Sequence, residues 1–177
     1  MADTFALEIL TPERVLWAGP AVALVVRTGE GNLTVLDGHT ALIGSVAPGE
    51  VRIDLDEGPS VRLAVHGGFL QVDTSAGAAE GAGLEEAGPG PIPGLSTRVT
   101  LLAGIAELAE EIDAERAELA RVAAEQRLAE LTGLGRSSSA EGGDGSDVEA
   151  QADLAQAQGE LDRAELRLAV ATASVSG

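Results

Sequence analysis

Apolar and polar residues alternate through the first part of the chain. From Phe5 to Asp73 the apolar residues form short runs of period two, separated by turns rich in Gly, Pro, Asn and Asp. Period two over four to eight residues is typical of strands with one buried face. Closely spaced strands without intervening helical patterns predict an all-β sandwich or barrel. The predicted inward positions are Phe5, Leu7, Ile9, Val22, Leu24, Val26, Leu33, Val35, Val51, Ile53, Leu55, Val61, Leu63, Val65, Leu70 and Val72.

Residues 76–97 interrupt this pattern. They are rich in Ala, Gly, Pro and Glu, have no apolar period, and contain few large apolar groups to offset the entropy cost of ordering. We therefore predict a flexible insertion here. Apolar residues resume at Val99–Leu102, which we expect to form a strand paired with Phe69–Val72. The β domain is thus predicted to span residues 1–102.

The apolar period changes after Gly104. Large apolar residues then recur at helical spacing, which predicts one helix over about 103–131 and a second over about 148–173. The residues 132–147 between them are rich in Gly, Ser and acids, a composition typical of a linker. Large residues alternating with Ala allow close approach, so we expect an antiparallel helical hairpin over 103–177. The predicted contact residues are Ile105, Leu108, Ile112, Leu119 and Val122 in the first helix, and Leu154, Ala157, Leu161, Ala164, Leu168 and Ala171 in the second.

The charge of the chain is strongly negative and unevenly divided. The 177 residues contain 11 Arg, no Lys and 29 acidic residues, a net charge of −18. Residues 1–75 hold 4 Arg and 10 acids, a net −6, whereas residues 76–177 hold 7 Arg and 19 acids, a net −12. This balance disfavours binding to nucleic acid or to anionic lipid, both of which need clustered positive charge.

Few residues offer catalytic or metal chemistry. The chain has no Cys, which excludes disulfides, thiolate nucleophiles and Cys-ligated zinc, and its two His residues have no metal-binding spacing around them. We therefore expect His39 and His66 to be structural. No apolar run reaches the length of a membrane span and the first residues do not resemble a signal peptide, so we expect a cytoplasmic protein without inserted segments.

Four motifs, in order, resemble one family. They are Gly31–His39 (GNLTVLDGH), Pro48–Val51 (PGEV), Gly67–Val72 (GGFLQV) and Val99–Asp113 (VTLLAGIAELAEEID). Their order and spacing resemble the epsilon subunit of bacterial F-type ATP synthase over about residues 3–131. The resemblance implies an α+β protein of two domains, an N-terminal antiparallel β-sandwich followed by a C-terminal antiparallel two-helix hairpin.

The resemblance also implies a function without chemistry of its own. Such a subunit lies in the central stalk, contacts the gamma subunit and the c-ring, and couples proton flow to ATP synthesis on the cytoplasmic side of the membrane. Its hairpin can reach the alpha and beta subunits and inhibit ATP hydrolysis. No cofactor is required, and His39, Gly38 and Phe69 become candidate partner contacts.

One further motif resembles a nucleotide-binding segment of some family members. Ile112 to Ala117 (IDAERA) fits the pattern (I/L)-D-x-x-R-A, with Glu107 five residues upstream, and Arg163 and Arg167 resemble a pair from the second helix. ATP is therefore a candidate regulatory ligand, bound by Glu107, Ile112, Asp113, Arg116, Ala117, Arg163 and Arg167. The alternative is that these charges form ordinary surface ion pairs, which are worth a few tenths of a kcal/mol each.

Two other hypotheses remain beside the coupling subunit. One is an ATP-sensing regulator of the same fold, and the other is a small β-domain ligand binder, which needs a pocket with convergent polar groups. For the coupling subunit, we expect a contiguous apolar patch on one face of the sandwich. Residues 148–177 contain two Arg against five acids, so we also predict weak inhibition, because an acidic target would repel this tail.

Overall fold

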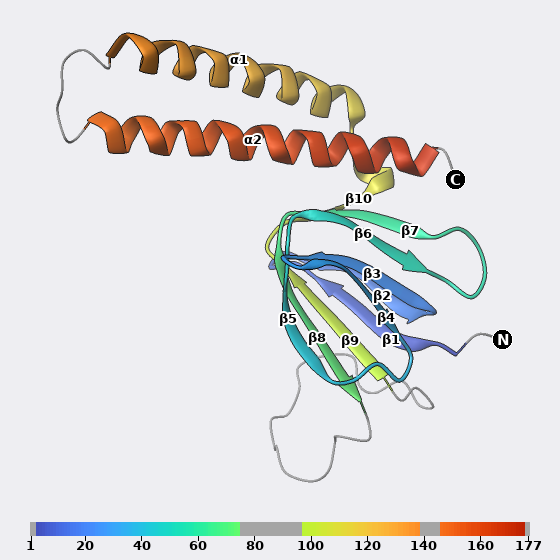
Figure 1. The fold of residues 1–177 in the computed structure, drawn as a ribbon. Helices are drawn as coiled ribbons and strands as arrows, with labels where there is room; N and C mark the ends of the chain where they lie inside the picture. The colour runs from blue at the N-terminus through green and yellow to red at the C-terminus, as the bar shows by residue number, and fades with distance from the viewer. Residues whose placement is uncertain (1–2, 75–96, 139–145, 176–177) are drawn as a thin grey trace. The chain divides into compact units, whose positions relative to one another are not determined.

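A computed structural model describes residues 3–74, 97–138 and 146–175. These residues divide into two compact units, and the division falls between Ala109 and Glu110. The first unit holds all the strands, and the second holds two long helices (Figure 1). The α+β fold predicted from the sequence is confirmed.

Two five-stranded sheets form the first unit. Sheet A contains, in spatial order, β2 (Val15–Ala21), β1 (Phe5–Leu10), β9 (Thr97–Ala103), β8 (Gly68–Thr74) and β5 (Leu42–Val46). Sheet B contains β10 (Ala106–Leu108), β7 (Val61–Val65), β6 (Gly49–Asp54), β3 (Ala23–Thr28) and β4 (Gly31–Leu36). Neighbouring strands are antiparallel with one exception, because β1 and β9 run parallel, with Leu7 opposite Val99. The predicted pairing of Val99–Leu102 with Phe69–Val72 is confirmed.

The core lies between the two sheets. Both faces contribute Val, Leu and Ile, joined by the fully buried ring of Phe5, and the partly buried Trp17 packs against this core. Twelve of the sixteen predicted inward positions are buried, and Val22, Leu33, Leu55 and Val61 are half-buried at the margins of the sheets. This alternation fixes which face each side chain occupies, because shifting a strand by one residue would move its core side chains to the solvent face.

The start of the first helix differs from the prediction. Residues 103–113 are not α-helical: β9 ends at Ala103, β10 pairs with β7 with Ala106 opposite Val65, and a short 3-10 helix, η1, covers Ala109–Glu111. Helix α1 is Ala114–Ser138. The apolar residues Ile105 and Leu108 fit a helix by spacing alone, but backbone pairing with β7 places this segment in the sandwich.

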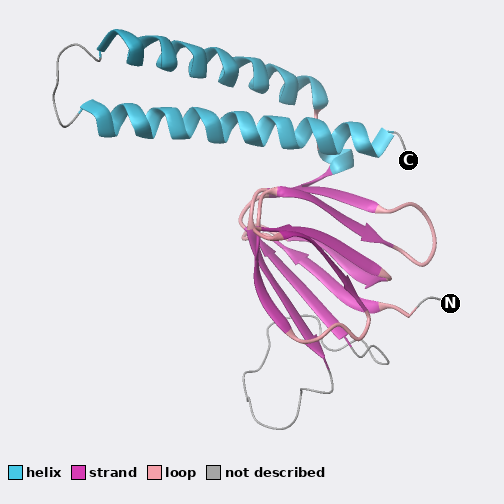
Figure 2. Ribbon diagram, viewed as in Figure 1, coloured by secondary structure: helices cyan, strands magenta, loops and turns pink. Residues whose placement is uncertain are grey.

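The end of the first helix also differs, because α1 continues seven residues beyond the predicted end at 131. Helix α2 is Ser146–Val175, close to its predicted range (Figure 2). The predicted linker 132–147 therefore shrinks, and its residues 139–145 lie outside the described residues. The predicted insertion 76–97 also lies outside the described residues, apart from Thr97, which begins β9.

The two helices are antiparallel and meet through small residues. Ala117 and Ala124 of α1 and Ala157 and Ala164 of α2 are buried, together with Val170. The predicted contact face of α1 was wrong, since the expected contact residues Leu119 and Val122 are 67% and 37% exposed. Alanine side chains let the helix backbones approach closely, and this displaces the larger residues to the outside.

Charged side chains link and brace the helices. Arg127 Nη1 of α1 lies 3.8 Å from Glu160 Oε2 of α2. Within α1, Arg121 contacts Glu118 at 2.6 Å, one turn away, and also Glu125. The hydrogen bond from Arg121 lowers the pKa of the Glu118 carboxyl, and the same contact raises the pKa of Arg121. Pairs at this spacing stabilise an exposed helix modestly.

Candidate functional site

An apolar row crosses the outer face of sheet A. The strand register places Val15 opposite Leu10, Leu10 opposite Leu102, and Leu102 opposite Phe69. Directly opposed residues in adjacent strands point to the same face of a sheet. Phe69 is 61% exposed, Val15 53% and Leu102 49%, while Leu10 is half-buried between them. We call these four residues the apolar band.

The band arises from apolar doublets in four strands. Each strand has two consecutive apolar residues: Ile9–Leu10, Val15–Leu16, Phe69–Leu70 and Leu101–Leu102. Because successive side chains in a strand point to opposite faces, one member of each doublet enters the core and the other must face outward. Sequence analysis singled out Phe69 but missed Val15, Leu10 and Leu102, and these doublets were the signal for them.

A cavity of about 800 Å³ lies against the band. The turn between β1 and β2 forms one wall, and Gly67, Gly68 and Gly104 form another. Gly68 has no alternative here, because a Cβ on it would lie 2.2 Å from the carbonyl oxygen of Leu102 and 3.0 Å from Cα of Ala103. This glycine lets β8 approach β9 closely at the position where the band crosses the two strands.

The neighbouring row on the same face is mostly polar. Gln71 lies opposite Thr100, and Thr100 lies opposite Glu8, with the exposed Ile43 at the edge on β5. Apart from Ile43, the exposed apolar side chains of these two rows lie in the band. A compact apolar band with a polar border is typical of a protein interaction surface.

The other two predicted partner contacts lie in a separate turn. Gly38 has a positive φ of 76° and donates its N–H to Oγ1 of the buried Thr97 at 2.8 Å. His39 donates its backbone N–H to the Leu36 carbonyl, and its Nδ1 lies 2.9 Å from the Thr40 carbonyl. These contacts fix the turn after β4. Their role in partner binding stays a prediction.

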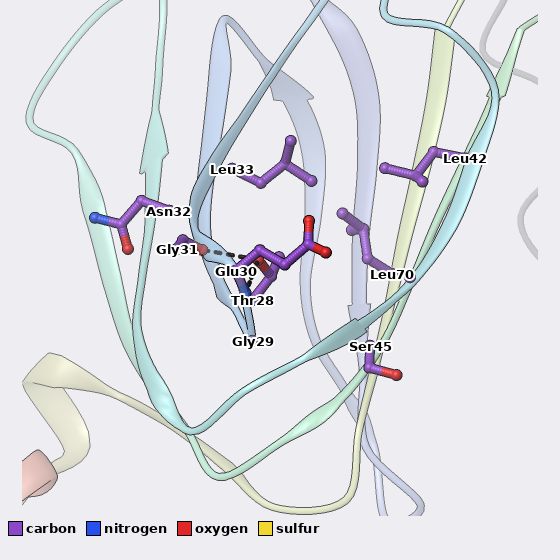
Figure 3. A pocket seen from close by; sticks show the side chains of 10 residues that line it. Thr28, Gly29, Glu30, Gly31, Asn32, Leu33, Leu42, Ser45 and Leu70 are labelled. Carbon is purple, nitrogen blue, oxygen red and sulfur yellow. Dashed lines mark hydrogen bonds between the residues drawn. The ribbon is translucent and has the colours of Figure 1, made fainter.

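A second cavity, of about 560 Å³, opens between the β3–β4 turn and β5 (Figure 3). Leu33, Leu42 and Leu70 supply its apolar lining, and Glu30 is the one ionisable side chain among its lining residues. Thr28 Oγ1 donates to the Gly31 carbonyl at 2.8 Å, which closes the hairpin turn. A single carboxylate without a neighbouring acid, base or nucleophile does not make a catalytic set.

The predicted nucleotide-binding residues are divided between the two units. Glu107 belongs to β10 in the sandwich, where its Oε1 lies 3.8 Å from Nε2 of the buried His66. Asp113, Arg116 and Ala117 lie at the start of α1, preceded by the half-buried Ile112.

Asp113 is the N-terminal cap of α1. Its Oδ1 accepts a hydrogen bond from the backbone N–H of Arg116 at 3.0 Å, and its carbonyl accepts one from Ala117 at 2.9 Å. Ala117 is buried in the contact between the helices. A capping carboxylate satisfies an N–H that the helix leaves without a partner and also favours the positive end of the helix dipole. Asp113 and Ala117 therefore have structural roles in this arrangement.

The two Arg of the second helix lie one turn apart on α2. Arg163 is exposed and Arg167 is half-buried. With the contact between Arg127 and Glu160 setting the register, Arg163 lies about 12 Å along the hairpin axis from the level of Arg116, and Arg167 about 6 Å. The described contacts do not draw these residues into one site, and nucleotide binding stays a prediction.

Residues 3–74, 97–138 and 146–175 contain neither a metal-binding cluster nor a membrane-spanning helix. No group of three or more His, Asp or Glu side chains there is placed to hold a metal ion. No helix in these ranges is long and apolar enough to cross a membrane. The apolar band is the most distinctive surface of the sandwich.

The family comparison gives the class of protein first. Residues 4–76 match the family described as "ATP synthase, Delta/Epsilon chain, beta-sandwich domain". Two solved structures share the fold. One is from the OSCP/F1/c-ring part of Euglena gracilis mitochondrial ATP synthase (TM-score 0.62, 19% identity, covering 100% of this chain and 84% of that chain). The other is from the central stalk and c-ring of Tetrahymena thermophila mitochondrial ATP synthase (TM-score 0.52, 12% identity, covering 96% and 98%).

Curated relatives then identify the particular family. The chain is 40% identical over 122 residues to the ATP synthase epsilon chain of Thermobifida fusca, covering 68% of this chain and 74% of the relative. It is 39% identical over 133 residues to that of Pelotomaculum thermopropionicum, covering 75% and 82%. The chain therefore belongs to the ATP synthase epsilon chain family, whose members are subunits of an enzyme complex. The resemblance seen in the sequence motifs is confirmed.

Proposed function

We propose that this chain is a non-catalytic subunit of the central stalk, which couples rotation of the c-ring to ATP synthesis through the gamma subunit. The apolar band on sheet A carries this proposal. A subunit that transmits torque needs a firm protein contact, and the band offers exposed apolar side chains on a rigid sheet. In this account the band rests against the gamma subunit.

The size of the band suits such a contact. An aromatic side chain buries roughly 200 Å² in a core, so the 61% exposure of Phe69 leaves roughly 120 Å² to cover, worth about 3 kcal/mol. Val15 and Leu102, each about half exposed, extend the same surface. A central aromatic anchor with apolar neighbours is the common form of an interface hot spot.

The competing function, a small-ligand binder, has less support. The cavity at the β3–β4 turn is large enough for a small molecule, but its lining contains one ionisable side chain and no convergent polar set. The apolar band lines an open hollow on the outer face of sheet A and not an enclosed pocket. The sandwich is therefore better suited to a protein partner.

The two-unit architecture supports a division of labour. The sandwich has a continuous core between two sheets, so it can transmit force as a rigid body. Among the described residues of the hairpin, the buried ones are four Ala and Val170, and the hairpin carries much of the chain's negative charge, which favours conformational change. We assign coupling to the sandwich and any regulation to the hairpin. Contact with the c-ring would hold the chain at the cytoplasmic side of the membrane.

Co-purification with the gamma subunit tests the proposal. The full chain, co-expressed with gamma from the same organism, is expected to form a stable one-to-one complex. Phe69→Gln and Leu102→Gln should each weaken that complex by tenfold or more, while Leu36→Gln, at an apolar position of similar exposure on sheet B, should leave it unchanged. Failure to bind gamma, or equal effects of all three substitutions, would contradict the proposal.

A further inference from the structure

Three of the four Arg in residues 1–75 gather on the outer face of sheet B. Arg27 projects from β3, Arg52 from β6 and Arg62 from β7. Together with Val25, Asn32 and Glu50 they line a shallow cavity of about 290 Å³, which we call the arginine groove. In a chain of net charge −18, three Arg side chains share the lining of this one cavity.

The strand register brings these side chains together. Arg52 lies opposite Val25 on one side and opposite Arg62 on the other, while Arg27 lies opposite Asn32. Their sequence neighbours Leu24, Val26, Val51, Ile53 and Leu63 are buried in the core, so the groove residues point outward from the same face.

The carboxylates nearby neutralise only part of this charge. Arg62 pairs with Glu50, and Arg52 pairs with Asp54 just outside the groove, at 3.0 Å from Nε to Oδ1. The Arg27 side chain makes no hydrogen bond or ion pair with any residue that the structure describes, and it is exposed. The groove lining therefore contains three guanidinium groups against one carboxylate.

Gly49 helps to position Arg27. A Cβ at this glycine would lie 3.0 Å from both Cβ and Cδ of Arg27, tighter than most real contacts of that kind, so the Arg27 stem would have to shift. The absence of a side chain at position 49 thus lets the stem of Arg27 lie across the neighbouring strand. Guanidinium groups held by their stems lose less freedom when they bind an anion.

We propose that the arginine groove docks an acidic segment of a protein partner, with a carboxylate side chain seated beside Arg27. Guanidinium groups bind carboxylates through paired hydrogen bonds, which gives both attraction and orientation. The groove volume, about 290 Å³, lies at the lower end of the range for small-molecule pockets, roughly 300–1,000 Å³, and the groove lies on an open sheet face. Both features favour one side chain of a larger partner over a whole small ligand. This contact is separate from the apolar band, and neither depends on the other.

Titration of the full chain with an oligoglutamate peptide tests the proposal, with backbone amide chemical shifts as the measurement. Saturable shifts are expected at Arg27, Asn32, Arg52 and Arg62, and they should weaken as salt is raised. Arg27→Gln should reduce the affinity about three- to tenfold. Arg14→Gln removes the same charge from the same unit but outside the groove, and it should leave the affinity unchanged.

Two further arms make the result decisive. Gly49→Ala should reduce the affinity with Arg27 still present, because the added methyl group displaces its stem. Inorganic phosphate at equal ionic strength should not saturate the groove. The proposal is overturned if the peptide causes no shifts in the groove, if Arg14→Gln and Arg27→Gln have equal effects, or if phosphate alone reproduces the shifts. None of these results bears on binding of the band to gamma.

Discussion

Replacing Asp113 distinguishes a helix cap from a nucleotide ligand. In Asp113→Ala the backbone N–H of Arg116 loses its 3.0 Å acceptor, and the first turn of α1 also loses a negative charge beside its positive end. Loss of an N-terminal cap costs about 1 kcal/mol, within a range of roughly 0.5–2 kcal/mol. For a unit of this size, 1 kcal/mol corresponds to a fall of about 4–8 °C in the melting temperature.

Thermal unfolding of the helical unit, followed by circular dichroism of the full chain, measures this effect. Asp113→Asn keeps a side-chain oxygen that accepts the hydrogen bond, so it should retain most of the stability. Equal losses in the Ala and Asn variants would refute the cap assignment. Calorimetry with ATP completes the test, because a cap without a ligand role predicts the same heat of nucleotide binding for Asp113→Asn as for the natural chain.

Three other predictions concern the sandwich, the helix charges and the tail. Gly68→Ala should destabilise the sandwich by about 2–3 kcal/mol in urea unfolding, because its methyl group clashes with the backbone of β9. Gly44→Ala is the control and should be tolerated, because a Cβ there meets no atom within 4 Å. An unchanged stability of Gly68→Ala would contradict the close approach of β8 and β9. Arg121 lowers the pKa of Glu118, so this pair contributes stability above the ordinary Glu pKa that is lost as the pH falls through the lowered value. The melting-temperature difference between the natural chain and Glu118→Gln should therefore shrink on acidification, and a difference that does not vary with pH would exclude the pair as its source. Removal of residues 110–177, which keeps β10 in place, should change ATP hydrolysis by the assembled enzyme less than about twofold at low salt, since the acidic tail is a poor match for an acidic target. A rise of several-fold would refute weak inhibition.

The strands and the core were predictable because alternation is a local signal. In each of the runs containing Phe5, Leu24 and Leu63, apolar residues at every second position mark the buried face. The position of β10 was not predictable in this way. Its three residues are held by pairing with β7, some forty positions earlier in the chain, and their apolar spacing fits a helix equally well.

The prediction of the contact residues between the two helices was wrong for a different reason. Leu119 and Val122 are the largest apolar residues at helical spacing in their part of α1, yet Ala117 and Ala124 are buried instead. A pattern of hydrophobicity does not report how closely two backbones approach, and close approach selects small residues. The capping bond of Asp113 was not predicted from the sequence, and its role as a nucleotide ligand stays a prediction.

The candidate surface was predictable in part. Phe69 was expected from its motif, and an apolar patch was expected from the class of protein. Leu10 and Val15 lay outside every predicted run, and Leu102 was counted only as the end of the run Val99–Leu102. Only the register of β2, β1, β9 and β8 shows that the outward members of four doublets form one row.

Site-directed cross-linking tests the central claim, that the band faces the gamma subunit, most directly. The chain has no Cys, so Ser45→Cys provides a unique thiol directly opposite Phe69 with almost no change in volume. Ser60→Cys, in the turn between β6 and β7, provides the matched control. In the assembled ATP synthase, a short cross-linker should join position 45 to gamma and leave position 60 unlinked. The account would be contradicted if position 45 formed no cross-link to gamma, or if only position 60 did.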